Sequence, residues 1–186
     1  YYDLYNTVKG TTSLIKHNER LLNKAIMEMD TDEAHYSDAN MTMRLSYGYI
    51  QDYTANGTHY DYFTTSQSLL DKIAQQNEIA DYVMEPEIAK LLKKGKFGKY
   101  KDKKTKQMQL CFLSNNDITG GNSGSPMFDG NGHVIGLAFD GNWEAMAGDI
   151  SFDPTLQRCI GVDIRFVLWI IERWGGGKNI IKELGL

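Results

Sequence analysis

The chain has 186 residues, with 20 Lys and Arg against 24 Asp and Glu, a formal charge of −4 and 41% hydrophobic residues. This composition is that of a folded globular chain of one domain with additional segments, and it excludes a disordered protein. The longest strongly apolar run, 166–171, is far too short to span a membrane, and the acidic balance argues against a nucleic-acid-binding protein.

The chain begins with Tyr1 rather than Met, which predicts a processed product or a piece of a longer protein. Localisation therefore cannot be inferred from this end. Cys111 and Cys159 are too few for a disulfide scaffold and lack the spacing of a metal site. Two buried thiols are the favoured interpretation, and a single bridge between them is the alternative.

Apolar residues up to Met29 recur three and four apart, which predicts one or two helices interrupted at Gly10. From Met41 to Tyr49, apolar and polar residues alternate, as in a half-buried strand. Asn56-Gly57 then predicts the turn of an antiparallel hairpin whose second strand lies within 58–65.

Residues 66–94 return to helical spacing, with Ser68 as a candidate cap and Pro86 at the start of a second helix. The segment 93–106 contains eight lysines and is expected to be a solvated loop, with a binding patch as the alternative. Strands are predicted at 108–113, 126–128 and 134–139, and a helix at 163–174. Together these elements predict short antiparallel strands in a barrel or sandwich, with helices before, within and after them.

The segment 119–126 carries the residues with catalytic potential. A serine nucleophile needs an exposed Oγ on a tight turn and backbone N–H groups directed at the developing oxyanion. Glycines at 120, 121 and 124 permit such a turn, and the N–H groups of Gly121 and Ser123 suit an oxyanion hole. The α/β-hydrolase elbow is excluded because Ser125 replaces its last glycine and a strand follows. Taken alone, the pattern also fits an ordinary turn.

This segment resembles the G-[DN]-S-G-x-P signature of chymotrypsin-like serine peptidases. More closely, it is similar to the C-terminal part of the bacterial dipeptidyl peptidase 7 and 11 family, from about residue 36 onward. The other segments that carry the resemblance are 38–45, 136–144, 148–150 and 162–165.

The resemblance implies a mainly β fold with flanking α-helices. Residues 1–36 would be the end of a helical insertion, and residues 37–186 a chymotrypsin-like (trypsin-like) antiparallel β-barrel with a terminal helix, the second barrel of a double-barrel peptidase. It also implies a periplasmic, cell-surface or secreted serine exopeptidase that releases dipeptides from free N-termini. The expected partners are peptide substrates, the N-terminal barrel of the same parent chain and a second copy in a homodimer, with no cofactor or metal.

Carried across by motif, Ser123 is the nucleophile, Gly121 supplies the oxyanion hole with it, and Asp140 holds the substrate's α-ammonium group. Gly141 occupies the position at which an arginine accompanies acidic second residues in this family. Because glycine cannot pair a carboxylate, the resemblance implies a hydrophobic or uncharged second residue. Without the family match, Asp140-Gly141 is read as a turn pair.

A serine nucleophile also needs a histidine base and an orienting aspartate. In chymotrypsin-like order the histidine lies about 140 residues before the serine, whereas 122 residues precede Ser123. The base is therefore expected outside the chain, which by itself should be nearly inactive. Asp30 and Asp32 fall near the interval of a triad aspartate, but the resemblance places the helical insertion there. Structural roles are expected for the four histidines, His17, His35, His59 and His133.

Two other functions remain open at this point. One is a peptidase-like barrel that has lost catalysis and serves as a binding module. The other is a chymotrypsin-like endopeptidase, which would cleave within blocked peptides. Retention of Ser123, its flanking glycines and Asp140 argues against the binding module.

Overall fold

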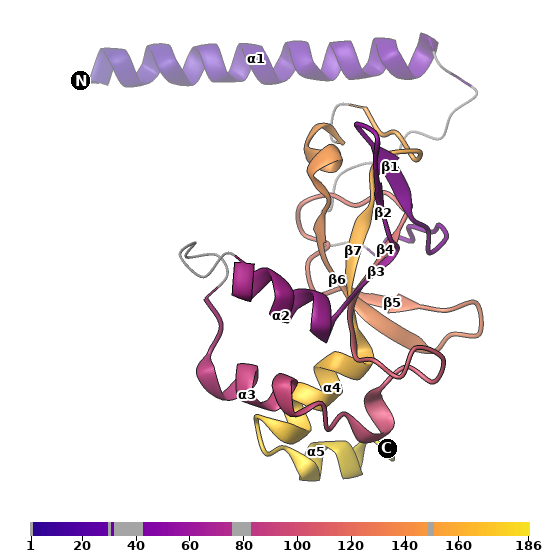
Figure 1. Cartoon of the computed structure of the whole chain (residues 1–186). Helices are drawn as coiled ribbons and strands as arrows, with labels where there is room; N and C mark the ends of the chain where they lie inside the picture. Colours follow the sequence, from indigo (N-terminus) through magenta and orange to yellow (C-terminus); the bar gives the residue numbers. More distant parts are fainter. Residues whose placement is uncertain (1, 30, 32–42, 76–82, 149–150) are drawn as a thin grey trace. The chain divides into compact units, whose positions relative to one another are not determined.

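The computed structural model describes residues 2–29, 31, 43–75, 83–148 and 151–186 (Figure 1). The chain divides into two units, Tyr1–Asn40 and Met41–Leu186. The expected boundary between residues 36 and 37 lies outside the described residues, as do Asp30, Asp32, His35 and the similar segments 38–42 and 149–150.

The first unit contains one helix, α1 (Tyr2–Met29), which is continuous over 28 residues. The predicted interruption at Gly10 is wrong. A Cβ added at Gly10 would meet nothing within 4 Å, and one glycine in a helix interior costs only about 1 kcal/mol, so the other residues carry the helix through. The described side chains of α1 are all exposed.

The second unit is built on an antiparallel sheet of five strands. Their order across the sheet is β3 (Phe63–Thr65), β4 (Gln109–Ser114), β7 (Cys159–Asp163), β6 (Val134–Gly141) and β5 (Pro126–Phe128). Over the described part of the chain the sheet is open, with β3 and β5 at its edges. The predicted antiparallel strands with several helices are therefore confirmed, whereas the chymotrypsin-like double barrel stays a prediction.

A separate hairpin joins β1 (Tyr53–Ala55) to β2 (Thr58–Tyr60). Asn56 and Gly57 have φ values of 51° and 75°, and the two-residue turn that joins paired strands requires positive φ at both positions. The predicted turn is confirmed, although the strands on either side of it have three residues each.

The strand expected over 41–49 is wrong for the residues described, 43–49, which form none. They run beside residues 115–117, where the Tyr49 N–H donates to Asn115 Oδ1 at 2.7 Å and Ser46 Oγ donates to the Asp117 carbonyl at 2.5 Å. Backbone pairing begins only at the end of this segment, where the Asn115 N–H donates to the Tyr49 carbonyl at 3.1 Å and Ile50 forms a bridge with Ser114. The alternating apolar side chains are exposed here, among them Leu45 at 88% and Tyr47 at 86%.

In the part of the chain that the structure describes, α2 (Ser66–Gln75) and α4 (Ile164–Arg173) pack against the sheet. Helix α3 (Pro86–Lys94) packs against α2, and α5 (Lys178–Glu183) packs against α4. Pro86 begins α3 as predicted. Ser68 does not cap α2 alone. The Ser68 N–H donates to Thr65 Oγ1 at 3.2 Å while the Thr65 N–H donates to Ser68 Oγ at 3.0 Å, so the two residues cap the helix reciprocally.

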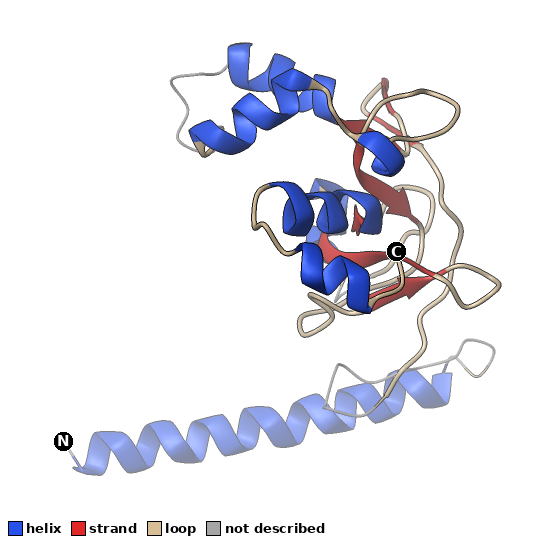
Figure 2. Ribbon diagram, turned by 90° about the horizontal axis from the view of Figure 1, so that it is seen from below, coloured by secondary structure: helices blue, strands red, loops and turns tan. Residues whose placement is uncertain are grey.

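The hydrophobic core lies between the sheet and these helices. Figure 2, seen from below, shows α4 and α5 covering one end of the strands. Trp169 of α4 is 1% exposed and meets Phe97 edge-on, with ring centroids 5.6 Å apart. The other buried members of this cluster are Leu92, Tyr100, Met108 and Leu110. The core therefore joins α3, β4 and α4.

Cys111 and Cys159 are free thiols on the neighbouring strands β4 and β7. Cys111 pairs with Val162 and Cys159 with Ser114, so the two cysteines are three residues out of register and form no bridge. Burial raises the pKa of both thiols. The interpretation as unpaired thiols is confirmed, with Cys159 buried and Cys111 half-buried.

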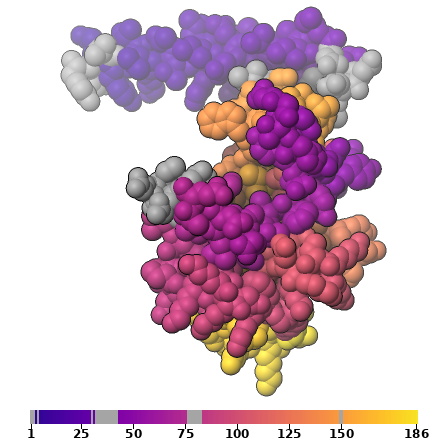
Figure 3. Space-filling view, in the orientation of Figure 1, coloured from indigo at the N-terminus to yellow at the C-terminus, as the bar shows by residue number. Residues whose placement is uncertain are grey.

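The lysine-rich segment 93–106 runs from the last turn of α3 through the 3-10 turn η2 (Gly98–Tyr100) to a tight loop. All eight lysines are exposed, as expected of a solvated segment. Phe97 and Tyr100 point inward and are 8% and 3% exposed. In Figure 3, the atoms of this part of the chain, magenta to pink, cover a continuous area of the lower front face.

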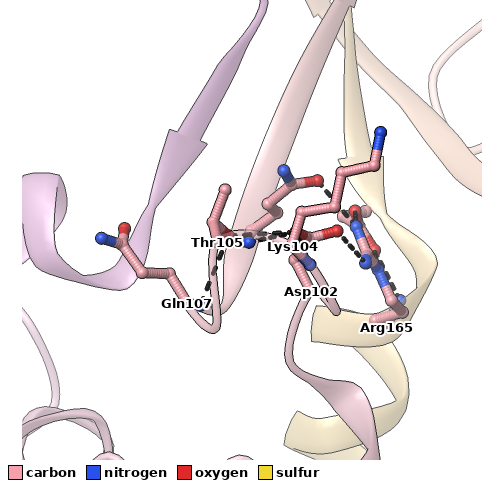
Figure 4. A network of polar contacts seen from close by, with 7 residues as sticks. Asp102, Lys104, Thr105, Gln107 and Arg165 are labelled. Carbon is pink, nitrogen blue, oxygen red and sulfur yellow. Dashed lines mark hydrogen bonds and ion pairs between the residues drawn. The ribbon is translucent and has the colours of Figure 1, made fainter.

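Asp102 organises the loop that ends this segment (Figure 4). Its Oδ1 accepts from the N–H groups of Lys104 and Thr105 at 2.9 and 2.8 Å, and its Oδ2 lies 3.3 Å from a guanidinium nitrogen of Arg165. These backbone hydrogen bonds, chiefly that of Thr105, together with Arg165, lower the pKa of Asp102 to about 2.

This depressed pKa predicts a pH-dependent contribution to stability. Because the pKa of Asp102 falls from 3.8 to about 2 on folding, its carboxylate stabilises the fold above about pH 4, and this contribution is lost as the pH falls towards 2. Urea unfolding of the protein and of Asp102→Asn should therefore give a difference in free energy that is largest above pH 4 and shrinks below it. A difference that stays constant across this range would show that the carboxylate charge is not what stabilises the loop.

Candidate active site

The loop that precedes β5 is held in shape by its own hydrogen bonds. Asn122 Oδ1 accepts from the Thr119 N–H at 2.8 Å, and the Asn122 N–H donates back to the Thr119 carbonyl at 3.1 Å. A second turn closes where the Ser125 N–H donates to the Asn122 carbonyl at 2.9 Å. Gly121 and Gly124 occupy the positions with φ of 101° and 83°, which a residue with a Cβ rarely adopts.

Strand β6 fixes the position of this loop. The Gly124 N–H donates to the Ala138 carbonyl at 2.7 Å, and the Ala138 N–H donates to the Ser125 carbonyl at 2.8 Å. Ser123 therefore lies exposed at the outer part of a turn whose base is fastened to the sheet. Within the described residues, the N–H groups of Gly121 and Ser123 donate to no other group. They remain available to an oxygen atom from outside.

Asp140 and Gly141 lie at the end of the same strand. Asp140 is two residues beyond Ala138, next to an irregularity in the pairing of β6 with β7, and its side chain is exposed. Asp140 Oδ1 accepts from the Gly141 N–H at 2.8 Å. The structure thus brings the Ser123 loop and the Asp140 carboxylate to the same end of β6.

The backbone at Gly141 has no room for a side chain. A Cβ placed there would lie 2.8 Å from the Cβ of Ala145, which belongs to the short helix η3 (Trp143–Ala147). This close approach depends on glycine, because the Cβ of an alanine cannot rotate away. The turn reading of Asp140-Gly141 is incomplete, since both residues belong to β6.

Asn142 holds the segment that follows. Its Oδ1 accepts from the Arg158 N–H at 2.8 Å, and its Nδ2 donates to the Leu156 carbonyl at 2.9 Å and to Glu144 Oε2 at 2.8 Å. The side chain is almost fully buried. Asn142 therefore joins the residues just after Gly141 to the loop that precedes β7.

Sequence analysis assigned no role to Asn142 and none to Arg158, which lies beside it. Arg158 is 2% exposed, yet its guanidinium group makes no ion pair within the described residues. Its five N–H groups donate to backbone carbonyls, among them Asp52 at 2.8 Å and Pro154 at 2.8 Å, and its cation lies 5.5 Å from the ring centre of Tyr53. The sequence could not predict these hydrogen bonds, because every residue has a backbone carbonyl and no residue type marks the ones that accept.

The described histidines have partners or positions of their own. His17 is on α1 and exposed. His59 lies near Asp52 and Asp61, and His133 Nδ1 is 3.1 Å from Asp129 Oδ2. That last pair closes the turn between β5 and β6, at the far end of β5 from Ser123. Bonding by His133 lowers the pKa of Asp129 to about 2. None of these three histidines hydrogen-bonds to Ser123.

No group of three or more His, Cys, Asp or Glu side chains in the described ranges could hold a metal ion. Among these residues, none of the helices combines the length and the apolar character that crossing a bilayer requires.

Comparison with known proteins gives a consistent result. The sequence model of the family described as Peptidase S46 matches residues 2–186. A curated relative named dipeptidyl-peptidase 7, from Porphyromonas endodontalis, is 53% identical over 159 residues, and one of the same name from Porphyromonas gingivalis is 49% identical over 173 residues. An Asp/Glu-specific dipeptidyl-peptidase from P. gingivalis is 35% identical over 187 residues.

A solved structure is similar as well. The P. endodontalis protein DPP11, crystallised in complex with the dipeptide Arg-Glu, superposes with a TM-score of 0.76 at 33% identity, over 87% of this chain and 23% of that one. The matches to the three curated relatives cover 85%, 92% and 100% of this chain. They cover only 19%, 24% and 26% of the relatives. The chain thus spans about a quarter or less of the proteins it matches.

Proposed function

Because this chain belongs to the peptidase S46 family, we propose that it carries the nucleophile and part of the substrate site of a serine dipeptidyl peptidase. The observation that supports this most directly is the Ser123 loop. Its serine is exposed, and the N–H groups of Gly121 and Ser123 make no bond within the described residues. N–H groups that the turn leaves unpaired beside an exposed serine hydroxyl are the donors that an oxyanion hole requires.

In the proposed reaction, Ser123 Oγ attacks the carbonyl carbon of the substrate's second residue. Its proton passes to a histidine base supplied from outside the described part of the chain, and the carbonyl oxygen, now negative, accepts from the N–H groups of Gly121 and Ser123. The peptide C–N bond then breaks, and the amine leaves with the proton from the base. Water hydrolyses the acyl-enzyme by the same steps in reverse order and releases the dipeptide.

Asp140 supplies the exopeptidase character in this proposal. A carboxylate at the end of β6, near the Ser123 loop, can pair with the α-ammonium group of a peptide whose scissile carbonyl lies at Ser123. A chain with a blocked N-terminus has no such cation. The enzyme would therefore release dipeptides rather than cleave within a chain.

The rest of the machinery is proposed to lie in the parent protein. An N-terminal barrel would supply the histidine and aspartate, and a homodimer and a periplasmic or cell-surface location follow from the family resemblance. The exposed apolar side chains of 43–49 are compatible with cover by another part of such a protein.

A panel of fluorogenic dipeptide substrates, free and N-blocked, tests the proposed function. The full-length protein should cleave free substrates with hydrophobic or uncharged second residues, while the 186-residue chain should be nearly inactive. No cleavage by either would favour an inactive binding module. Cleavage of blocked peptides would favour an endopeptidase.

Gly141 is expected to set the preference for the second residue. An arginine at this position would pair an acidic side chain, but its Cβ would strike Ala145. The informative variant in the full-length protein is therefore Gly141→Arg combined with Ala145→Gly, which makes room for the new side chain. We expect kcat/KM for substrates with Asp or Glu in second position to rise at least about tenfold relative to Leu.

Ala145→Gly alone is the matched control, because it adds the space without the charge. It should leave the ratio of acidic to hydrophobic substrates unchanged. An unaltered ratio in a well-folded double variant would place the second-residue pocket elsewhere.

A further inference from the structure

The lysine-rich segment 93–106 separates charge within the chain. It holds eight lysines and one aspartate, a net charge of +7, whereas the whole chain carries −4. The other 172 residues therefore carry −11. Such segregation creates a local positive potential on a protein that is acidic as a whole.

The acidic groups beside the segment offset only part of its charge, among them Glu172, which interacts electrostatically with Lys99. Asp102 is bound by Arg165 and by backbone N–H groups (Figure 4). Glu172 Oε2 accepts from the Tyr100 hydroxyl at 2.6 Å, and this bond lowers the pKa of Glu172. Among the residues that the structure describes, no lysine of the segment lies within ion-pair distance of a carboxylate.

The core holds the segment in a fixed form. Phe97 and Tyr100 are buried beside Trp169, and Asp102 closes the loop that follows. Four of the lysines line one hollow of about 400 Å³ together with Arg165. They are Lys99, Lys101, Lys103 and Lys104. The ammonium groups are thus presented together on an ordered surface rather than on a loose tail.

The composition of this surface narrows the class of partner. Within the segment the apolar side chains, Phe97 and Tyr100, are buried, and Tyr62 is the one exposed aromatic residue among those that line the hollow. A single aromatic ring makes neither the aromatic core of a protein interface, where lysine is depleted, nor a platform on which successive bases stack. What remains is a set of hydrated point charges. A layer of phosphate headgroups requires only such charges.

We propose that the surface formed by residues 93–106 adsorbs to the headgroup layer of an anionic phospholipid membrane. Each lysine near such a surface contributes about fivefold to the partition coefficient, and salt screens the attraction. Adsorption would be peripheral and reversible, with no apolar insertion. This inference does not depend on the proposed peptidase function.

Vesicle co-sedimentation of the 186-residue protein tests the proposal. The probes are vesicles of phosphatidylcholine mixed with phosphatidylglycerol and vesicles of phosphatidylcholine alone. We expect binding to the anionic vesicles only, with a loss of at least about tenfold between about 50 mM and about 300 mM salt. Because anionic vesicles repel a protein with a net charge of −4, any binding to them must come from a local basic surface.

Two charge-matched variants locate that surface. Lys→Gln changes at 99, 101, 103 and 104 should lower the partition coefficient at least about tenfold. The same change at Lys9, Lys16, Lys24 and Lys72, which are exposed on α1 and α2, should alter it less than about twofold. Circular dichroism verifies that both variants fold. Equal losses in the two variants, no preference for anionic vesicles, or tighter binding to an oligonucleotide of comparable charge would overturn the proposal.

Discussion

Replacing Ser123 with alanine in the full-length protein is expected to lower kcat by about 10⁴-fold or more, because the variant lacks the proposed nucleophile that forms the acyl-enzyme. The fold should be unaffected. The Ser123 side chain is exposed, and the bonds that shape the loop come from Asn122, Gly124 and Ser125. Steady-state kinetics on a free dipeptide substrate measures the loss, and thermal unfolding should show a change within about 0.5 kcal/mol.

Ser125→Ala is the matched control. Ser125 lies in the same turn, and its structural bonds are made by its backbone, which alanine retains. This variant should keep activity within a few-fold of the unaltered enzyme. If Ser123→Ala retained most of the turnover, or if the two variants lost activity equally, Ser123 would not be the nucleophile.

Asp140→Ala should remove the preference for a free N-terminus. An ammonium group that loses a charge-assisted hydrogen bond to its carboxylate loses about 1.5 to 3 kcal/mol, so kcat/KM for free dipeptide substrates should fall by about 10-fold to 10²-fold. Blocked substrates never make this contact and should keep their low rate. The ratio of the two rates in the full-length protein is the measurement.

Asp61→Ala provides the comparison for Asp140. Asp61 is exposed and follows the β1–β2 hairpin. Asp61→Ala therefore removes the same charge as Asp140→Ala, but from another part of the fold. The ratio of free to blocked substrates should not change in this variant. Equal losses on free and blocked substrates in Asp140→Ala would mean that Asp140 supports the loop rather than the ammonium group.

Local chemistry explains what the sequence could predict. The turn at Asn56-Gly57 was predictable because few residues tolerate positive φ at both central positions. Strands β4 and β6 were predictable from their apolar runs and the turns beside them. The Ser123 loop was predictable because glycine spacing restricts the backbone, as the φ values of Gly121 and Gly124 illustrate.

Other features depend on partners that local patterns do not encode. The alternation of apolar and polar residues over 43–49 indicates an extended segment with one apolar and one polar face. It does not reveal whether a neighbouring strand forms backbone hydrogen bonds with that segment. Here the Asn115 side chain accepts from the Tyr49 N–H, and backbone pairing is limited to the bonds around residues 49–51. The bond from Arg158 to the Asp52 carbonyl spans 106 residues. Helix α5 follows a glycine run that indicated only an end to the preceding helix.

Arg158 has a consequence for the conditions under which the candidate site keeps its form. Its partners are backbone carbonyls, which neither gain nor lose a proton, and its burial shields it from dissolved ions. Asn142, which continues the connection to Gly141, does not titrate either. The support behind the Asp140 segment should therefore tolerate acid and salt that weaken the pairing of Asp102 with Arg165. A segment with such support keeps its geometry when the pH or the salt concentration of the surrounding medium changes.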